Sequence, residues 1–195
     1  MARAQLRRRP LGRAGFSLLE LIIVLIIVAL VTSFVLPRIN LTRYQIESAM
    51  QSVGTTLLAT QRLAVTRQHD IILLFDVSGN AFRIHEDANN NGGVDAGERS
   101  RRVPLGEHVV FGLAGANPRP MGPGPVTYQK LIGGEPALVF HRDGSASEAR
   151  GFYLTSERAA RFGTHPEDTR AIETDRATGR ANWYRYAAPT WKRGF

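Results

Sequence analysis

The chain has 195 residues and a formal net charge of +8, from 25 lysines and arginines against 17 acids. It contains no cysteine, which excludes a disulfide framework and a thiolate metal site. Five of the basic residues lie among residues 1–15, which contain no acid, so residues 16–195 carry 20 basic and 17 acidic residues, a net charge of +3. Most of the basic excess is therefore local to the N-terminus, which argues against a strong nucleic-acid surface elsewhere.

Residues 16–36 form an apolar run of 21 residues in which Glu20 is the only charged side chain. At about 1.5 Å per residue, one helix of this length crosses the roughly 30 Å of a bilayer core. Basic residues are denser before the run than after it, so the positive-inside rule predicts a cytoplasmic N-terminus and an exported C-terminal part. The run is longer than the apolar region of a cleaved secretory signal, and an ordinary signal anchor is the alternative interpretation.

The residues around the start of this run form a specific motif. Gly15-Phe16-Ser-Leu-Leu-Glu20, followed by the apolar run and Pro37, resembles the type III signal of type IV pilins and pseudopilins. The resemblance implies that a prepilin peptidase cleaves after Gly15 and methylates the new N-terminus at Phe16, and that Pro37 bends the helix. It implies a leader at residues 1–15, a transmembrane helix at 16–37, and a single-pass protein of the inner (cytoplasmic) membrane with a periplasmic C-terminal domain.

Glu20 has a physical role in this interpretation. Cleavage after Gly15 leaves a charged α-amine on Phe16, and a carboxylate one helical turn along can pair with such an amine on a neighbouring subunit. An unpaired charge in a low-dielectric environment is costly, so this ion pair sets the register between subunits of a filament. Pairing of Glu20 with the amine of its own chain remains the alternative.

The pattern of apolar residues changes along the rest of the chain. Residues 38–68 carry a helical stripe that includes Ile46, Met50, Val53 and Leu57, which predicts an amphipathic continuation of the helix. From residue 69 to 195 short apolar or alternating runs separated by turns predict a β-rich domain, with strands at 70–75, 81–86, 109–113, 137–141, 151–155, 171–174 and 180–186. Residues 114–125 are expected to form an irregular loop, and residues 157–169 a polar, mobile excursion. The predicted fold is α+β, with one long N-terminal helix packed on an antiparallel sheet.

This order of elements is similar to that of the GspH/FimT-type minor pseudopilins. The likeness rests on the strand–turn–strand after the helix, the Asp/Asn/Gly-rich loop that follows it, residues 140–144 and the closing hairpin at 178–180. The resemblance implies a pilin-like fold and a structural subunit of the type II secretion pseudopilus, assembled into a filament for protein export. Its partners would be other pseudopilins, the prepilin peptidase and an inner-membrane assembly platform.

The segment from Asp87 to Glu98 fits the calcium-loop pattern D-x-[DN]-x-[DN]-G-x₅-E. Calcium prefers oxygen ligands, and this spacing offers side-chain or carbonyl oxygens at six positions. The candidate ligands are Asp87, Asn89, Asn91, Gly93, Asp95 and Glu98. No cofactor is required by the sequence, and calcium is the one candidate. The alternative is a hairpin loop whose polar side chains satisfy its own backbone.

The C-terminal segment interleaves cations with aromatic residues, an arrangement that can stack bases and contact phosphates. The cations are Arg180, Arg185, Lys192 and Arg193. Some FimT-like minor pilins of competence pili bind DNA through a Gly-Arg-x-Arg signature, and this chain has Gly-Arg-Ala-Asn at residues 179–182. The alternative function is therefore a minor type IV pilin for DNA uptake. The other interpretation of this segment is a hairpin with inward aromatics and outward cations.

The sequence offers no pattern typical of an enzyme. Its five histidines have no metal-ligand spacing, and neither a nucleophile elbow nor a phosphate-binding loop occurs. We therefore expect a structural protein without catalytic residues.

Overall fold

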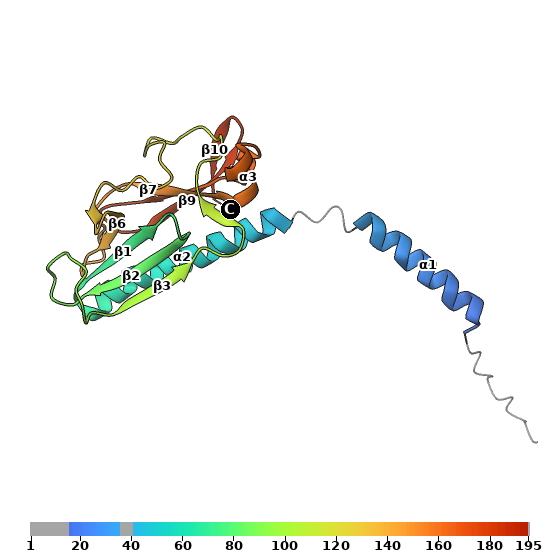
Figure 1. Ribbon diagram of the computed structural model, residues 1–195, viewed down its shortest axis with the longest axis horizontal. Helices are drawn as coiled ribbons and strands as arrows, with labels where there is room; N and C mark the ends of the chain where they lie inside the picture. The colour runs from blue at the N-terminus through green and yellow to red at the C-terminus, as the bar shows by residue number, and fades with distance from the viewer. Residues whose placement is uncertain (1–15, 36–40, 195) are drawn as a thin grey trace, which may run out of the picture. The chain divides into compact units, whose positions relative to one another are not determined.

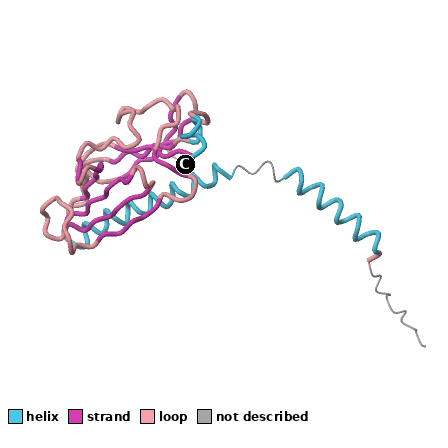
Figure 2. Tube along the Cα trace, viewed as in Figure 1, coloured by secondary structure: helices cyan, strands magenta, loops and turns pink. Residues whose placement is uncertain are grey.

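The computed structural model describes residues 16–35 and 41–194. The chain divides into two compact units, Met1–Asn40 and Leu41–Phe195 (Figure 1). The described part of the first unit is helical, and the second combines helices with many strands (Figure 2). The α+β class predicted from the sequence is confirmed.

The first unit contains α1 (Leu18–Val35), an 18-residue helix. Among residues 16–35 and 41–194, no helix is both long enough and apolar enough to cross a membrane. The helix includes the charged residue Glu20 in its first turn. The predicted transmembrane helix at 16–37 is therefore not supported, and the predicted single-pass localisation in the inner membrane, with a periplasmic C-terminal domain, is wrong.

The second unit begins with α2 (Leu41–Arg67), a 27-residue helix with one buried face. The apolar stripe predicted from the sequence is the buried face. Its apolar members are Ile46, Ala49, Met50, Val53, Leu57 and Ala64. Their spacing of three and four residues places them on one side of the helix, where they join a core shared with strands of both sheets.

The strands form two five-stranded sheets in which every described pairing is antiparallel. The first has the order β3-β2-β1-β6-β5 and the second the order β10-β9-β8-β7-β4. The first contains β1 (Asp70–Asp76), β2 (Ala81–Asp87), β3 (Ser100–Pro104), β5 (Leu131–Ile132) and β6 (Glu135–Phe140). The second contains β4 (Val109–Phe111), β7 (Gly151–Ser156), β8 (Arg170–Thr174), β9 (Ala181–Ala187) and β10 (Thr190–Arg193).

β1 is buried on both faces, which explains its continuous apolar sequence. Successive side chains of a strand point to opposite faces of the sheet. Phe75, like Ile71 and Leu73, lies in the large core beneath α2, whereas Ile72 and Leu74 pack with residues of β6 in a second cluster. β1 is thus the central strand that joins the two layers of packing.

Aromatic rings fill the middle of the large core. The ring centroid of Phe75 lies 5.4 Å from that of Phe82, 5.1 Å from that of Phe152 and 5.1 Å from that of Tyr128. Burial raises the pKa of the Tyr128 phenol, whose hydroxyl is paired with that of Thr174 at 2.7 Å. The four rings link β1, β2 and β7 to the segment before β5, so they tie the two sheets together.

One predicted loop and three short strands differ from the sequence prediction. The polar excursion expected at 157–169 contains α3 (Glu157–Phe162) and the short 3₁₀ helix η2 (Pro166–Asp168). Ser156 caps α3 by accepting a hydrogen bond from the backbone N–H of Ala159 at 3.2 Å, and Gly163 ends the helix in a left-handed conformation. The strands β3, β5 and β10 were not predicted, because each is short and mostly exposed and therefore lacks an apolar alternation.

Removing the Phe75 ring should destabilise the fold strongly. The side chain is fully buried among four other rings, so Phe75→Ala leaves a cavity, and we expect a loss of about 3–5 kcal/mol in the free energy of unfolding. Phe162→Ala is the matched control, because this side chain is 67% exposed on α3 and its removal should cost less than about 0.5 kcal/mol. Denaturant unfolding of both variants checks this, and equal losses would contradict the assigned core.

Candidate functional site

The start of α1 carries the residues that the sequence assigned to processing and assembly. The hydroxyl of Ser17 accepts a hydrogen bond from the backbone N–H of Glu20 at 3.1 Å, so Ser17 caps the helix. The spacing S-x-x-E is that of a capping box, which in the sequence alone marks the start of a helix. Phe16 is 83% exposed and Glu20 is exposed as well. Gly15 and Pro37 lie outside the described residues.

The apolar side chains of α1 are exposed around the whole helix. Exposed large apolar residues occupy consecutive positions, from Leu21 through Val28, so no single face is set apart as polar. A helix that is apolar all round is normally buried rather than left in contact with water. α1 thus exposes apolar side chains that a helix of this composition normally buries.

The segment from Asp87 to Glu98 joins β2 to β3 and is organised by its own polar side chains. Asp87 is 1% exposed, and its carboxylate accepts hydrogen bonds from the backbone N–H groups of Asn91 at 3.0 Å and Gly92 at 2.7 Å. Glu98 lies 2.7 Å from Nε2 of His85 and accepts from the backbone N–H of Ala88 at 2.8 Å. The pKa of Glu98 is held below its ordinary value, first by the His85 hydrogen bond and then by backbone donors.

The middle of this loop is also held by hydrogen bonds within the loop. Asp95 accepts from the side-chain amides of Asn89 at 2.8 Å and Asn91 at 2.5 Å, which lowers the pKa of its carboxyl group. The amide oxygen of Asn91 accepts in turn from the backbone N–H of Gly93 at 2.8 Å. The chain thus brings the predicted ligands into one loop. The side-chain oxygens among them accept hydrogen bonds from N–H groups of the loop itself.

Among the described residues, no group of three or more histidines or acids is placed to hold a metal ion. The donor set of the loop, carboxylate and amide oxygens, is nevertheless the type that calcium prefers. A calcium ion would have to replace several of the internal hydrogen bonds of the loop. Calcium binding by Asp87, Asn89, Asn91, Gly93, Asp95 and Glu98 stays a prediction.

The cations near the C-terminus lie on the β9–β10 hairpin and just before it. Lys192 is directly opposite Arg185 in the strand register, whereas Arg193 donates to the side chain of Asn182 at 2.7 Å. Arg180 precedes β9 and is exposed. The cations are thus divided between two places, and their role in DNA binding stays a prediction.

The aromatic residues of the hairpin are engaged in packing. The indole N–H of Trp191 donates to the carbonyl of Asn117 at 2.8 Å, and its ring centroid lies 5.8 Å from that of Tyr153 and 5.2 Å from that of Tyr186. The guanidinium of Arg119 lies 3.5 Å from the ring centroid of Tyr184 and forms an ion pair with Glu173 at 2.6 Å. These rings serve the tertiary structure, which is the alternative that the sequence had left open.

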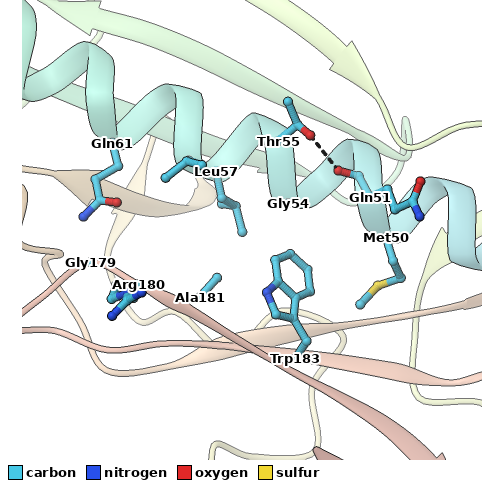
Figure 3. Close-up of a pocket in the computed structure, with 11 residues that line it drawn as sticks. Met50, Gln51, Gly54, Thr55, Leu57, Gln61, Gly179, Arg180, Ala181 and Trp183 are labelled. Carbon is cyan, nitrogen blue, oxygen red and sulfur yellow. Dashed lines mark hydrogen bonds between the residues drawn. The ribbon is translucent and has the colours of Figure 1, made fainter. Parts of the chain in front are cut away.

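A groove of about 610 Å³ lies between α2 and the start of β9 and was not predicted (Figure 3). The Trp183 ring points from β9 toward Gly54, and a Cβ atom at position 54 would lie 3.1 Å from its Cζ2 atom. Gln61 donates to the carbonyls of Gly144 at 2.7 Å and Thr178 at 2.6 Å, which fixes α2 to two turns. The glycine within the helical pattern was the one sequence signal for this close approach.

Comparison with known proteins gives likenesses of structure. No protein-family model matches the chain, and no curated protein matches its sequence closely enough to count as a relative. The structure is similar to that of the minor pseudopilin EpsH from the type II secretion system of Vibrio cholerae, with 14% identity and a TM-score of 0.44 over 72% of this chain and 97% of EpsH. A second crystal structure of EpsH matches with 20% identity and a TM-score of 0.41 over 75% of this chain and 97% of EpsH.

Calcium should stabilise the chain if the loop binds it. With a dissociation constant of about 1 mM, calcium at about 10 mM should add RT ln 11, about 1.4 kcal/mol, because a ligand that binds only the folded state stabilises it. We expect the melting temperature to rise by about 3–4 °C. The double variant Asp87→Asn/Glu98→Gln, which keeps the shape of both side chains, should lose this rise. An equal rise in melting temperature with magnesium, or no rise with calcium, would contradict a calcium site and leave the loop with a structural role.

Proposed function

We propose that this chain is a minor pseudopilin-like structural subunit of a type II secretion pseudopilus, assembled into a filament that serves protein export. Its partners in this role are other pseudopilins, a prepilin peptidase and an assembly platform. The observation that carries the proposal is the motif from Gly15 to Glu20, which leads into the first turn of a helix whose large apolar side chains are exposed on every face.

The division of the chain fits this role. Residues 1–15 would be the leader, and residues 16–37 the helix that enters the filament. Residues 38–68 would continue as the helix beneath the globular part, and residues 69–195 would supply the β-rich pseudopilin domain. The burial of one face of α2 against both sheets supports the last two assignments. Pro37 would bend the helix between its two halves, because proline removes a backbone donor.

Contacts between α1 helices would supply the driving force for assembly. Large apolar side chains of α1 are exposed, and packing against helices of neighbouring subunits would remove them from water at about 25 cal/mol per Å². Apolar packing alone does not fix the stagger of one helix on the next. The carboxylate of Glu20, paired with the Phe16 amine of a neighbouring subunit, would select one register because a mismatched charge would stay unpaired.

The role is structural, and no catalytic step is assigned to this chain. The described titratable groups with clear partners serve the fold: Asp175, for example, accepts from the hydroxyl and backbone N–H of Thr178 in the β8–β9 turn. These hydrogen bonds lower the pKa of the Asp175 carboxyl group, as expected for an acid that closes a turn.

Processing should occur at one bond. When the chain is produced together with a prepilin peptidase, N-terminal sequencing should begin at Phe16, and mass spectrometry should find one added methyl group on its amine. Gly15→Val places a branched side chain at the cleaved bond, and this variant should keep residues 1–15. A start at Met1 in the unmodified chain, or at a residue beyond 30, would contradict the proposed role.

Replacing Glu20 should disturb assembly without disturbing the globular part. In Glu20→Leu the Phe16 amine of the neighbouring subunit loses its partner, and in a low-dielectric bundle this costs about 3–5 kcal/mol. Cross-linking between co-produced pseudopilins should therefore fall strongly. Glu20→Asp keeps the charge and is the matched control, with an intermediate yield expected. Cross-linking of Glu20→Leu at the unmodified level would refute the pairing role.

A further inference from the structure

A second groove lies on the other side of α2, between this helix and the edge strand β3. Its volume is about 630 Å³. Ala59 and Leu63 of α2 and Ile84 of β2 form an apolar floor, and Arg99 and Arg101 form a basic wall. Figure 1 shows β3 running alongside α2 at the border of the first sheet.

The outer edge of β3 is free to pair with another strand. β3 is the last strand of its sheet, next to β2 alone. The carbonyl of Arg99 accepts from the N–H of Glu86 at 2.9 Å, and the N–H of Leu105 donates to the carbonyl of Asn80 at 3.0 Å, so residues 99, 101, 103 and 105 turn their backbone groups toward β2. Because the two sides alternate along a strand, the N–H and C=O groups of Ser100 and Arg102 point outward.

Two side chains on the α2 face, at the start of β3 and just before it, are basic and lack partners among the described residues. Arg101 lies directly opposite Ile84 in the register, so it projects to the same face as the groove, and Arg99 follows two residues away. Both are exposed, and neither forms an ion pair or hydrogen bond through its side chain with any described residue. Glu86, the one acid that lines the groove, already lies 3.6 Å from Nε2 of His69.

The neighbouring arginine on the opposite face shows what a structural arginine does on this strand. Arg102 donates to the carbonyl of Gly79 at 2.8 Å and lies 3.5 Å from the carboxylate of Asp76, so it holds the β1–β2 turn. Arg99 and Arg101 have no such contact. They therefore supply positive charge beside an apolar floor and an open strand edge.

We propose that this groove binds an extended, acid-rich segment of a partner protein, which adds to the first sheet as a strand next to β3. The outward groups of Ser100 and Arg102 form the backbone hydrogen bonds, and these give affinity without selecting a sequence. Residues of the added strand opposite Arg99 and Arg101 are acidic. Arg101 turns its backbone groups toward β2, so it forms a non-hydrogen-bonded pair with the added strand, in which side chains approach most closely. This proposal stands on the groove and does not require the filament role.

The open backbone groups and the positive charge together favour an acidic strand over a helix, a nucleic acid or a second copy of this chain. Strand addition satisfies the exposed backbone groups, which a helix or a nucleic acid does not. A second copy of this chain would present its own basic β3 in an edge-to-edge pairing, and like charges would then face one another. Charged residues on an edge strand also protect against such pairing, which is consistent with a site reserved for an acidic partner.

The test uses the purified full chain and three labelled octapeptides. The probe is (Glu-Val)₄, and its controls are (Lys-Val)₄, with reversed charge, and (Glu-Pro)₄, which keeps the charge but lacks half of the backbone donors. Fluorescence anisotropy should show binding of (Glu-Val)₄ that weakens as salt rises, and binding at least about tenfold weaker for both controls. Equal binding of (Glu-Pro)₄ would overturn strand addition.

Variants then locate the site. Arg99→Glu/Arg101→Glu should weaken binding of (Glu-Val)₄ by about tenfold or more, because two attractive pairs become repulsive. Arg142→Glu/Arg176→Glu makes the same charge change at two exposed arginines elsewhere and should leave it within about twofold. Ser100→Pro removes an outward donor at the first residue of β3, where proline is tolerated, and should weaken binding while the melting temperature is kept. Ser100→Ala is its control.

Three further results would overturn the proposal. They are equal losses in the two arginine double variants, binding of a single-stranded oligothymidine that competes with (Glu-Val)₄ on this face, and a dimer in light scattering that Arg99→Glu/Arg101→Glu dissolves. The second result would mark a general polyanion surface, and the third a contact between copies of this chain.

Discussion

The packing of one face of α2 against both sheets is the interaction on which the second unit depends. Ile46, Met50 and Leu57 share a core with strands of both sheets, so neither sheet has a complete apolar partner without the helix. The aromatic ring of Phe75 lies at the centre of this core, on the strand that is buried on both faces. A polar change on this face would therefore disturb two sheets at once. The two flanks of this face border the two grooves, with Met50 and Leu57 in the first groove and Leu63 in the second.

Around this core, turns are held by side chains that satisfy backbone groups. Asp76 accepts from the N–H of Gly79 at 2.7 Å, and Asp87 accepts from two backbone N–H groups of its loop. Gln61 does the same from the helix by donating to two carbonyls. A buried or half-buried backbone group without a partner costs free energy, so these short polar side chains specify the loops as firmly as apolar ones specify the core. The same kind of hydrogen bond organises the loop that carries the calcium-loop pattern.

The parts of the fold that were predictable are those with a strong period. α2 ends at Arg67, one residue before the end of the predicted helical stretch at 38–68. β1, β2, β7 and β8 coincide with predicted apolar or alternating runs. Among the shorter elements, β3 was missed because Arg101 and Arg102 read as loop residues, and α3 because its capping by Ser156 outweighs a polar composition. α1 begins at Leu18, inside the apolar run, because Ser17 caps the helix.

The candidate sites were predictable to a different degree, since a motif gives residue identity and spacing but not the partners of a side chain. The loop from Asp87 to Glu98 gathers the predicted residues, yet its oxygens face internal donors. The arginines show most clearly that a sequence does not give the partners of a side chain. Burial lowers the pKa of Arg170, which donates to the carbonyl of Glu167 at 2.8 Å, and Arg102 holds a turn, whereas Arg99 and Arg101 contact no described acid. In the sequence all four are equivalent cations. The structure shows that Arg170 and Arg102 stabilise the fold. The register of β3 and the position of α2 leave Arg99 and Arg101 beside a groove, where they can bind a partner.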